Sequence, residues 1–147
     1  MSSFSPQEIA YLQSQLLGRL ATAGVDGDPH VVPVGFRYNP ELDTIDVGGH
    51  GMAQSKKYRD VARNGRAAFV VDDLVSVDPW TPRMLAVRGR AEALPSGGQA
   101  IMPDFAPELI RILPTWIGSF GINASGFDLD SRNVSESSAA TAKERPA

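Results

Sequence analysis

The stretch DVGGHGMAQSKKYRDVARNGR (residues 46–66) decides how the rest of this sequence is interpreted. It predicts the end of a strand, then a glycine loop, then a short basic helix. Gly48, Gly49 and Gly51 let backbone N–H groups approach a ligand, because no Cβ stands in the way. Ser55 is the expected N-cap of the helix.

Lys56 and Lys57 fall in the first turn of that helix, where the helix dipole already places partial positive charge. A bound phosphate or carboxylate would reconcile the free N–H groups and the two lysines in one site. The same pattern is typical of a solvated basic helix after a flexible loop, so the residues alone leave both interpretations open.

The composition points to one domain with a small anionic ligand. The chain has 147 residues, 42% of them hydrophobic, which is enough for one ordinary core. Its net charge is -3, which argues against a nucleic-acid partner. Positive charge is concentrated in the central stretch, which holds five of the fourteen Lys and Arg residues: Lys56, Lys57, Arg59, Arg63 and Arg66.

The expected location is the cytoplasm. The chain has no cysteine, so it forms no disulfides and no thiolate site. Its first residues lack the charged start and apolar run of a signal peptide, and no run of about 18 apolar residues is present to cross a bilayer. We therefore expect no membrane partner.

Upstream of the central stretch, a helix and a hairpin are predicted. Ser5 and Pro6 look like a helix start, followed at helical spacing by Ile9, Leu12, Leu16 and Leu17. A short strand is expected over 19–23 and a turn over 24–29.

Residues 30–38 alternate with a period of two, which predicts a strand. Pro33 cannot donate to a ladder, so the strand is an edge or is interrupted there. Gly35 would leave room for a flat group, although a bulge at a barrel edge explains it equally well.

Further strands are expected at 44–47, 67–71, 84–94 and 112–122, and residues 67–71 read as buried on both faces. Trp80 lies on a loop and is a lid, a dimer contact or a local plug. After about residue 125 few large apolar side chains remain, so we expect one domain over 1–124 and a disordered tail over 125–147.

The sequence lacks its own acid–base machinery. His30 and His50 have no neighbouring ligands at metal spacing, so no metal site is expected. His50 lies inside the glycine loop, where it could donate to a phosphate. The carboxylates are scattered over turns, without a general acid and base pair. An anion site without such a pair suits a redox cofactor, which carries the chemistry itself.

The order of these pieces resembles the pyridoxamine 5'-phosphate oxidase-like, split β-barrel superfamily, and most closely its actinobacterial flavin/deazaflavin oxidoreductases that use coenzyme F420. The resemblance spans about residues 16–122. It is carried by RLATAG (19–24), GDPHVVPVGFRYNP (27–40), TIDVG (44–48), SKKYRDVARNGR (55–66), RGRAE (88–92) and RILPTWIGSFGI (111–122).

The resemblance implies a mainly β fold with short helices: a six-stranded antiparallel split β-barrel, the FMN-binding split barrel, assembled as a homodimer with cofactor sites between subunits. Lys57 matches the family's phosphate-binding lysine, with Ser55 and Lys56 beside it. Val32, Pro33 and Val34 match the backbone beside the cofactor ring. With Gly49 and His50 of the glycine loop, these are the predicted cofactor-binding residues. The chain departs from the family at Asp60, Gly65 and Phe120, where Asn, Pro and Trp are frequent.

The function implied by the resemblance is that of an F420-dependent oxidoreductase, which transfers a hydride between the deazaflavin and a small unsaturated or planar substrate. FMN is the alternative cofactor. The alternative functions are an FMN flavoprotein of the same fold and a non-catalytic protein that binds F420, haem or a tetrapyrrole.

Overall fold

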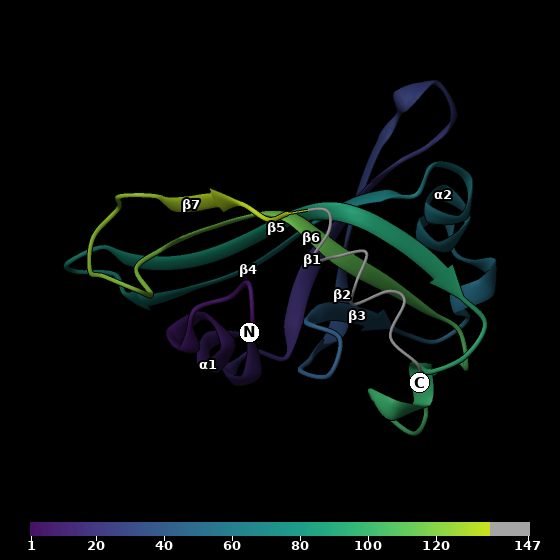
Figure 1. The fold of residues 1–147 in the computed structure, drawn as a ribbon, viewed down its shortest axis with the longest axis horizontal. Coiled ribbons are helices and arrows are strands. Elements are labelled where there is room, and N and C mark those ends of the chain that lie inside the picture. Colours follow the sequence, from purple (N-terminus) through teal and green to yellow (C-terminus); the bar gives the residue numbers. More distant parts are fainter. Residues whose placement is uncertain (136–147) are drawn as a thin grey trace.

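Within residues 1–135, which are the part of the chain that this computed structural model describes, seven antiparallel strands form one sheet that curls back on itself (Figure 1). The strand order is β3-β2-β1-β4-β5-β6-β7, and an additional β3–β6 pairing closes six of the strands into a barrel. This confirms the predicted six-stranded antiparallel barrel and adds one strand outside it. The helices and strands are α1 (Pro6–Ser14), β1 (Leu17–Ala23), β2 (Pro29–Asn39), β3 (Thr44–Gly48), α2 (Lys56–Asn64), β4 (Arg66–Ser76), β5 (Thr81–Leu94), β6 (Leu109–Phe120) and β7 (Asp130–Asn133).

Helix α1 is shorter than expected. Ser5 and Glu8 form a capping box at its start, as the sequence suggests, but the helix ends at Ser14. Leu17 already opens β1, and Leu16 is 86% exposed rather than packed on a helical stripe. The helical spacing therefore overestimated the length of the helix. Leu16 lies in the connection to β1, and Leu17 is the first residue of that strand.

Strand β2 behaves as an edge where Pro33 lies. Pro33 pairs with Arg19 of β1, whereas the ladder between β2 and β3 begins only at Gly35. On the β3 side, the residues before Gly35 have no strand partner within the described chain. This explains why a proline is tolerated in a strand that is central further along.

Strand β4 is buried on one face only, which corrects the expectation for residues 67–71. Ala67, Phe69 and Val71 point into the barrel and are buried, whereas Ala68 and Val70 are partly exposed on the outer face. The apolar outer residues gave a continuous hydrophobic run, and the structure leaves that face of the barrel uncovered by any described element. The core is formed by the inward side chains of all six barrel strands, together with Phe4, Tyr11, Leu12, Met52 and Val61.

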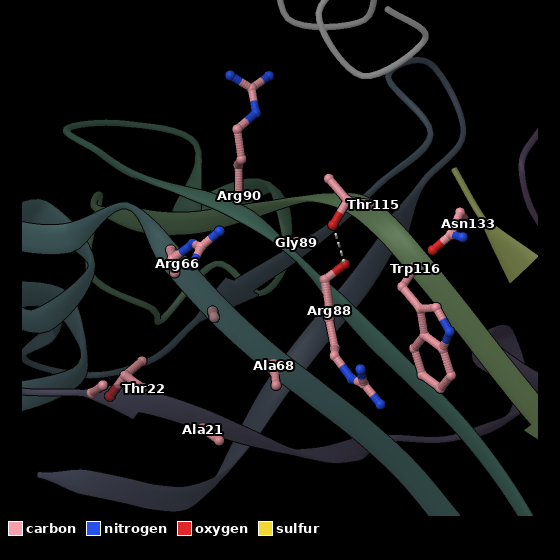
Figure 2. Close-up of a pocket in the computed structure, with 12 residues that line it drawn as sticks. Ala21, Thr22, Arg66, Ala68, Arg88, Gly89, Arg90, Thr115, Trp116 and Asn133 are labelled. Atoms are coloured by element: carbon pink, nitrogen blue, oxygen red, sulfur yellow. Dashed lines mark hydrogen bonds between the residues drawn. The ribbon is translucent and has the colours of Figure 1, made fainter. Parts of the chain in front are cut away.

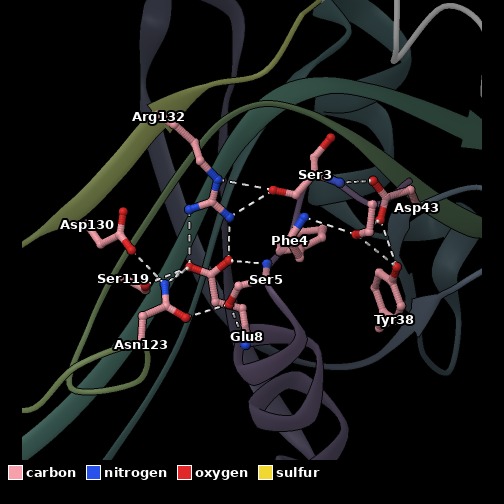
Figure 3. A network of polar contacts seen from close by, with 11 residues as sticks. Ser3, Phe4, Ser5, Glu8, Tyr38, Asp43, Ser119, Asn123, Asp130 and Arg132 are labelled. Atoms are coloured by element: carbon pink, nitrogen blue, oxygen red, sulfur yellow. Dashed lines mark hydrogen bonds and ion pairs between the residues drawn. The ribbon is translucent and has the colours of Figure 1, made fainter.

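Strand structure continues past residue 124, where we expected the domain to end. Strand β7 pairs with the second half of β6 and lies inside the predicted tail. Arg132 holds it there, because its guanidinium donates to the Ser3 carbonyl and to the buried carboxylate of Glu8 (Figure 3). Ser119 adds a 2.7 Å hydrogen bond to Glu8. The remainder of the predicted tail, 136–147, lies outside the described residues.

Neither helix in the described part of the chain combines the length and apolar character needed to span a bilayer.

Candidate functional site

The basic helix α2 starts and ends as its sequence dictates. Ser55 is the N-cap, and its Oγ accepts from the Tyr58 N–H. Gly65 follows the helix with φ 69°, a left-handed conformation that favours glycine. As in any α-helix, the first backbone N–H groups, here those of Lys56 and Lys57, have no carbonyl within the helix to bond. The helix tip therefore presents both N–H groups and ammonium groups.

Lys57 is half-buried, and burial lowers the pKa of its ammonium. The structure gives Lys57 Nζ no hydrogen bond and no ion pair among residues 1–135. A partly desolvated ammonium without an acceptor is costly unless an anion approaches it. This side chain fits the phosphate of a cofactor better than any other predicted site residue.

Lys56 is engaged within the protein. Its Nζ lies 2.9 and 3.0 Å from the two carboxylate oxygens of Asp60, one turn along the helix. Asp60 is 2% exposed and also accepts a 2.9 Å hydrogen bond from Thr22 Oγ. Burial raises the pKa of Asp60, but hydrogen bonds from Lys56 and Thr22 and the nearby His30 outweigh it, so the net pKa is lowered. Asp60 stays ionised and holds Lys56.

The glycine loop is attached to another loop of the protein. The carbonyl of Gly49 accepts from the Ala106 N–H at 2.9 Å. The exposed His50 packs edge-on against Phe105, with ring centroids 5.6 Å apart. The Phe105 ring also covers Gly35 and Gly48, where added Cβ atoms would lie 3.0 and 2.7 Å from it. The space that we expected beside Gly35 for a flat ligand is therefore filled by Phe105.

The three predicted ring-binding residues lie on β2 just after His30. Val32 and Val34 point inward, with Val34 buried, whereas Pro33 points outward and is exposed. Their backbone pairs with β1, and no strand within residues 1–135 pairs with the opposite edge of this segment.

The structure brings the predicted residues into two groups. Ser55, Lys56 and Lys57 lie at the tip of α2, which packs against β1 near the turn of the β1–β2 hairpin, where Thr22 pairs with His30. Gly49 and His50 instead lie against Phe105 and Ala106. Met52 lies between the two groups: Ser55 Oγ donates to its carbonyl at 2.6 Å, and a Cβ at Gly49 would lie 4.0 Å from its Cε.

Two adjoining grooves run along the outer face of the barrel and were not anticipated from the sequence. Figure 2 shows the residues that line the larger of the two. Their volumes are about 510 and 330 Å³, and Ala21, Ala68, Arg88 and Trp116 line both. Arg88 stacks on the Trp116 ring with 4.0 Å between its Cζ and the ring centroid. Arg90 points away from this pair in Figure 2. We call this surface, lined by Ala21, Val31, Ala68, Ala86, Arg88 and Trp116, the outer groove.

The outer groove could have been found from the strand pattern. Residues 68 and 88 lie opposite each other in the β4–β5 ladder, and residues 88 and 116 in the β5–β6 ladder. Whether these side chains point outward depends on how inward and outward positions alternate along each strand. In β4 this alternation cannot be seen in the sequence, because residues 67–71 are all apolar. The bulge after Arg88 also changes the alternation of β5.

Among residues 1–135, no group of three or more His, Asp or Glu side chains is placed to hold a metal ion.

Comparison with known proteins places these features in a family. Residues 5–106 match the family model described as pyridoxamine 5'-phosphate oxidase. A curated relative, the 5a,11a-dehydrotetracycline/5a,11a-dehydrooxytetracycline reductase of Streptomyces rimosus, is 48% identical over 119 residues, which cover 81% of this chain and 84% of the relative.

Solved structures share the fold. A haem-binding protein from Mycobacterium smegmatis has a TM-score of 0.68 at 19% identity; the match covers 95% of this chain but spans only 62% of that protein's length. An FAD-binding protein from the same organism has a TM-score of 0.58 at 25% identity, covering 79% of this chain and 95% of that one. Together with the named reductase, the barrel and the family match identify this chain as an oxidoreductase and as a member of the pyridoxamine 5'-phosphate oxidase family.

Proposed function

We propose that this protein is an F420-dependent reductase in which the phosphate of the deazaflavin is held at the tip of α2. The observation that carries this proposal is Lys57, a half-buried ammonium without an acceptor among the described residues, beside the free N–H groups of the first helical turn. A charge-assisted contact to phosphate would satisfy both.

The cofactor, when bound, supplies the hydride transfer, and the protein supplies position and surroundings. Lys57 and the N–H groups at the start of α2 would bind the phosphate. The open edge of β2 at Val32, Pro33 and Val34 would lie along the ring. The reduction adds a hydride and a proton to the substrate, and the proton would come from solvent, so the part of this chain is to fix the ring against the substrate.

The substrate class that we propose is a planar, polycyclic, unsaturated ketone. Support comes from the Streptomyces rimosus relative, whose name gives dehydrotetracyclines as its substrates. The identity of 48% covers most of both chains, which supports a substrate similar in shape to the dehydrotetracyclines.

We also propose that the protein is a homodimer and that a second copy covers the outer groove. Val31 and Leu129 line this groove and are 65% and 52% exposed. Small side chains at Ala21, Ala68 and Ala86 leave its floor flat enough for close approach. Covering apolar side chains of this size is favourable by about 25 cal/mol per Å² of apolar area removed from water.

An anaerobic assay tests the proposed function. The purified protein is mixed with reduced F420 and 5a,11a-dehydrotetracycline, and oxidation of the deazaflavin is followed by absorbance. We expect oxidation only when protein and substrate are both present, and none with reduced FMN in place of F420. A protein that purifies yellow with bound FMN, or that binds F420 without consuming it with any polycyclic enone, would contradict the proposal.

A further inference from the structure

A buried carboxylate lies one helical turn from the proposed phosphate site. Asp60 is 2% exposed and accepts hydrogen bonds from Lys56 Nζ, at 2.9 and 3.0 Å, and from Thr22 Oγ, at 2.9 Å. Its two oxygens therefore bind one of the two lysines at the tip of α2.

This contact fixes how many positive charges the site can offer. The Nζ of Lys56 is also confined on the hairpin side, because a Cβ at Gly24 would lie 2.7 Å from it. Lys57 has no acceptor among the described residues. Arg59, on the same turn, is exposed and donates to the Gln54 carbonyl at 2.8 Å. Lys57 is thus the half-buried ammonium that is free for an anion, and Lys56 is neutralised by Asp60. The Arg59 guanidinium keeps its charge, but solvent screens it.

Phosphate ligands differ in the charge that they bring to such a site. A phosphodiester carries one negative charge, whereas a phosphomonoester carries about 1.5 to 2 at pH 7, because its second pKa is about 6. Every charge taken out of water requires a partner. Lys57 can pair with one negative charge. A second one would have beside it the neutralised Lys56–Asp60 pair and the exposed, solvent-screened guanidinium of Arg59.

We propose that Asp60 is a specificity-determining residue that, by holding Lys56, makes the site prefer a phosphodiester cofactor over a phosphomonoester cofactor. The inference rests on the proposed function and deepens it, since F420 carries a phosphodiester and FMN a phosphomonoester.

A matched pair of ligands tests this proposal: FMN and riboflavin 5'-methyl phosphate, which share one ring system and differ by one charge and a methyl group. Their dissociation constants are measured by flavin fluorescence at pH 7.5 for wild type and for Asp60→Asn. Asp60→Asn releases Lys56, so FMN should bind about tenfold more tightly, whereas the diester should change by less than about threefold.

A charge-restoring variant separates this effect from a structural one. Lys56→Gln/Asp60→Asn keeps the net charge of the wild type, removes the released ammonium and should return the ratio of the two constants to the wild-type value. An unchanged ratio in Asp60→Asn, or a ratio that the double variant fails to restore, overturns the proposal. Circular dichroism and a thermal melt check that each variant is folded.

If Asp60→Asn does not fold, the pH dependence of ligand binding to the wild-type protein tests the proposal instead. Between pH 5.5 and 7.5, FMN loses its second phosphate proton and the diester does not. The ratio of the dissociation constant for FMN to that for the diester should therefore rise about three- to tenfold with pH. A flat ratio overturns the proposal.

The two levels of inference fail in distinguishable ways. If F420, FMN and the diester bind equally well to wild type and Lys57→Ala, or do not bind, the site of the proposed function is wrong and this inference fails with it. If binding depends on Lys57 but the ratio of the two dissociation constants is the same in wild type and Asp60→Asn, only the inference about Asp60 is overturned.

Discussion

Three buried carboxylates in the described chain each have a basic partner. Glu8 is bound by Arg132, Asp46 by Arg111 at 3.0 Å, and Asp60 by Lys56 at 2.9 Å. Removing the basic member of such a pair leaves an unpaired, poorly solvated carboxylate, which destabilises the folded protein. The first joins α1 to β7, the second joins β3 to β6, and the third lies beside the proposed cofactor site.

Loss of the Arg132–Glu8 ion pair, which attaches β7 to α1, should lower stability. We predict that Arg132→Ala lowers the free energy of unfolding by about 2–4 kcal/mol, because Glu8 is fully buried and loses the one basic partner that it has within residues 1–135. Arg132 itself is 31% exposed. Urea denaturation at pH 7 measures this. The exposed Arg63→Ala serves as the control and should change stability by less than about 0.5 kcal/mol. Equal effects of the two substitutions would contradict the prediction.

The same carboxylate predicts how stability depends on pH. Burial raises the pKa of Glu8, but hydrogen bonds from Arg132, Ser119 and the Ser5 N–H outweigh it, so the pKa in the folded protein lies below the ordinary value of 4.5. A lowered folded pKa gives stability that is complete above pH 4.5 and is lost as the pH falls through the folded value. Denaturation curves between pH 7 and 3 should therefore show a smaller acid-induced loss for Glu8→Gln than for wild type. Parallel curves would show that Glu8 does not contribute.

At the scale of elements, sequence patterns located the six barrel strands and α2, because period-two alternation and cap residues are local signals. They failed where tertiary surroundings decide. Leu16 and Leu17 continued a helical spacing but lie past the end of α1. Phe105 lies between the strands expected at 84–94 and 112–122, and its ring covers Gly35 and Gly48. No local pattern indicates which distant ring will cover a glycine.

The two ends of α2 allow a matched pair of substitutions. Gly65→Ala should lower stability by about 1 kcal/mol, because Gly65 has φ 69°. Ser55→Ala removes the N-cap and should cost a similar amount, about 1 kcal/mol. We predict that only Ser55→Ala also weakens cofactor binding, since it loosens the end that carries Lys57. Thermal melts and F420 titrations of both variants check this, and equal losses of affinity would contradict the assigned binding end.

At the scale of the whole molecule, barrel closure could not be worked out from the chain alone. The contact between β3 and β6 joins residues more than sixty positions apart, as in the pairing of Asp46 with Arg111. The barrel was expected only through the family resemblance. Strand β7 was missed because its four residues, Asp130 to Asn133, are polar and owe their place to β6 and to the Glu8–Arg132 pair.

The outer groove predicts the effect of a charge on assembly. Val31→Asp places a carboxylate in the groove that we propose a second copy covers, so the dimer should dissociate at micromolar concentration. Val25→Asp, at the equally exposed turn of the β1–β2 hairpin and not among the residues that line the grooves, should leave it intact. Light scattering coupled to size exclusion gives the mass of each. A monomeric wild-type protein, or a dimer unaffected by Val31→Asp, would contradict this assignment.

The most direct test of the central claim is the affinity for F420 of wild type and Lys57→Ala, measured by fluorescence titration with Arg63→Ala as the control. If Lys57 grips the phosphate, its loss should weaken binding by roughly 1.5–3 kcal/mol, about ten- to more than a hundredfold, while Arg63→Ala stays within about twofold of wild type. An unchanged affinity in a folded Lys57→Ala variant would show that the cofactor is bound elsewhere.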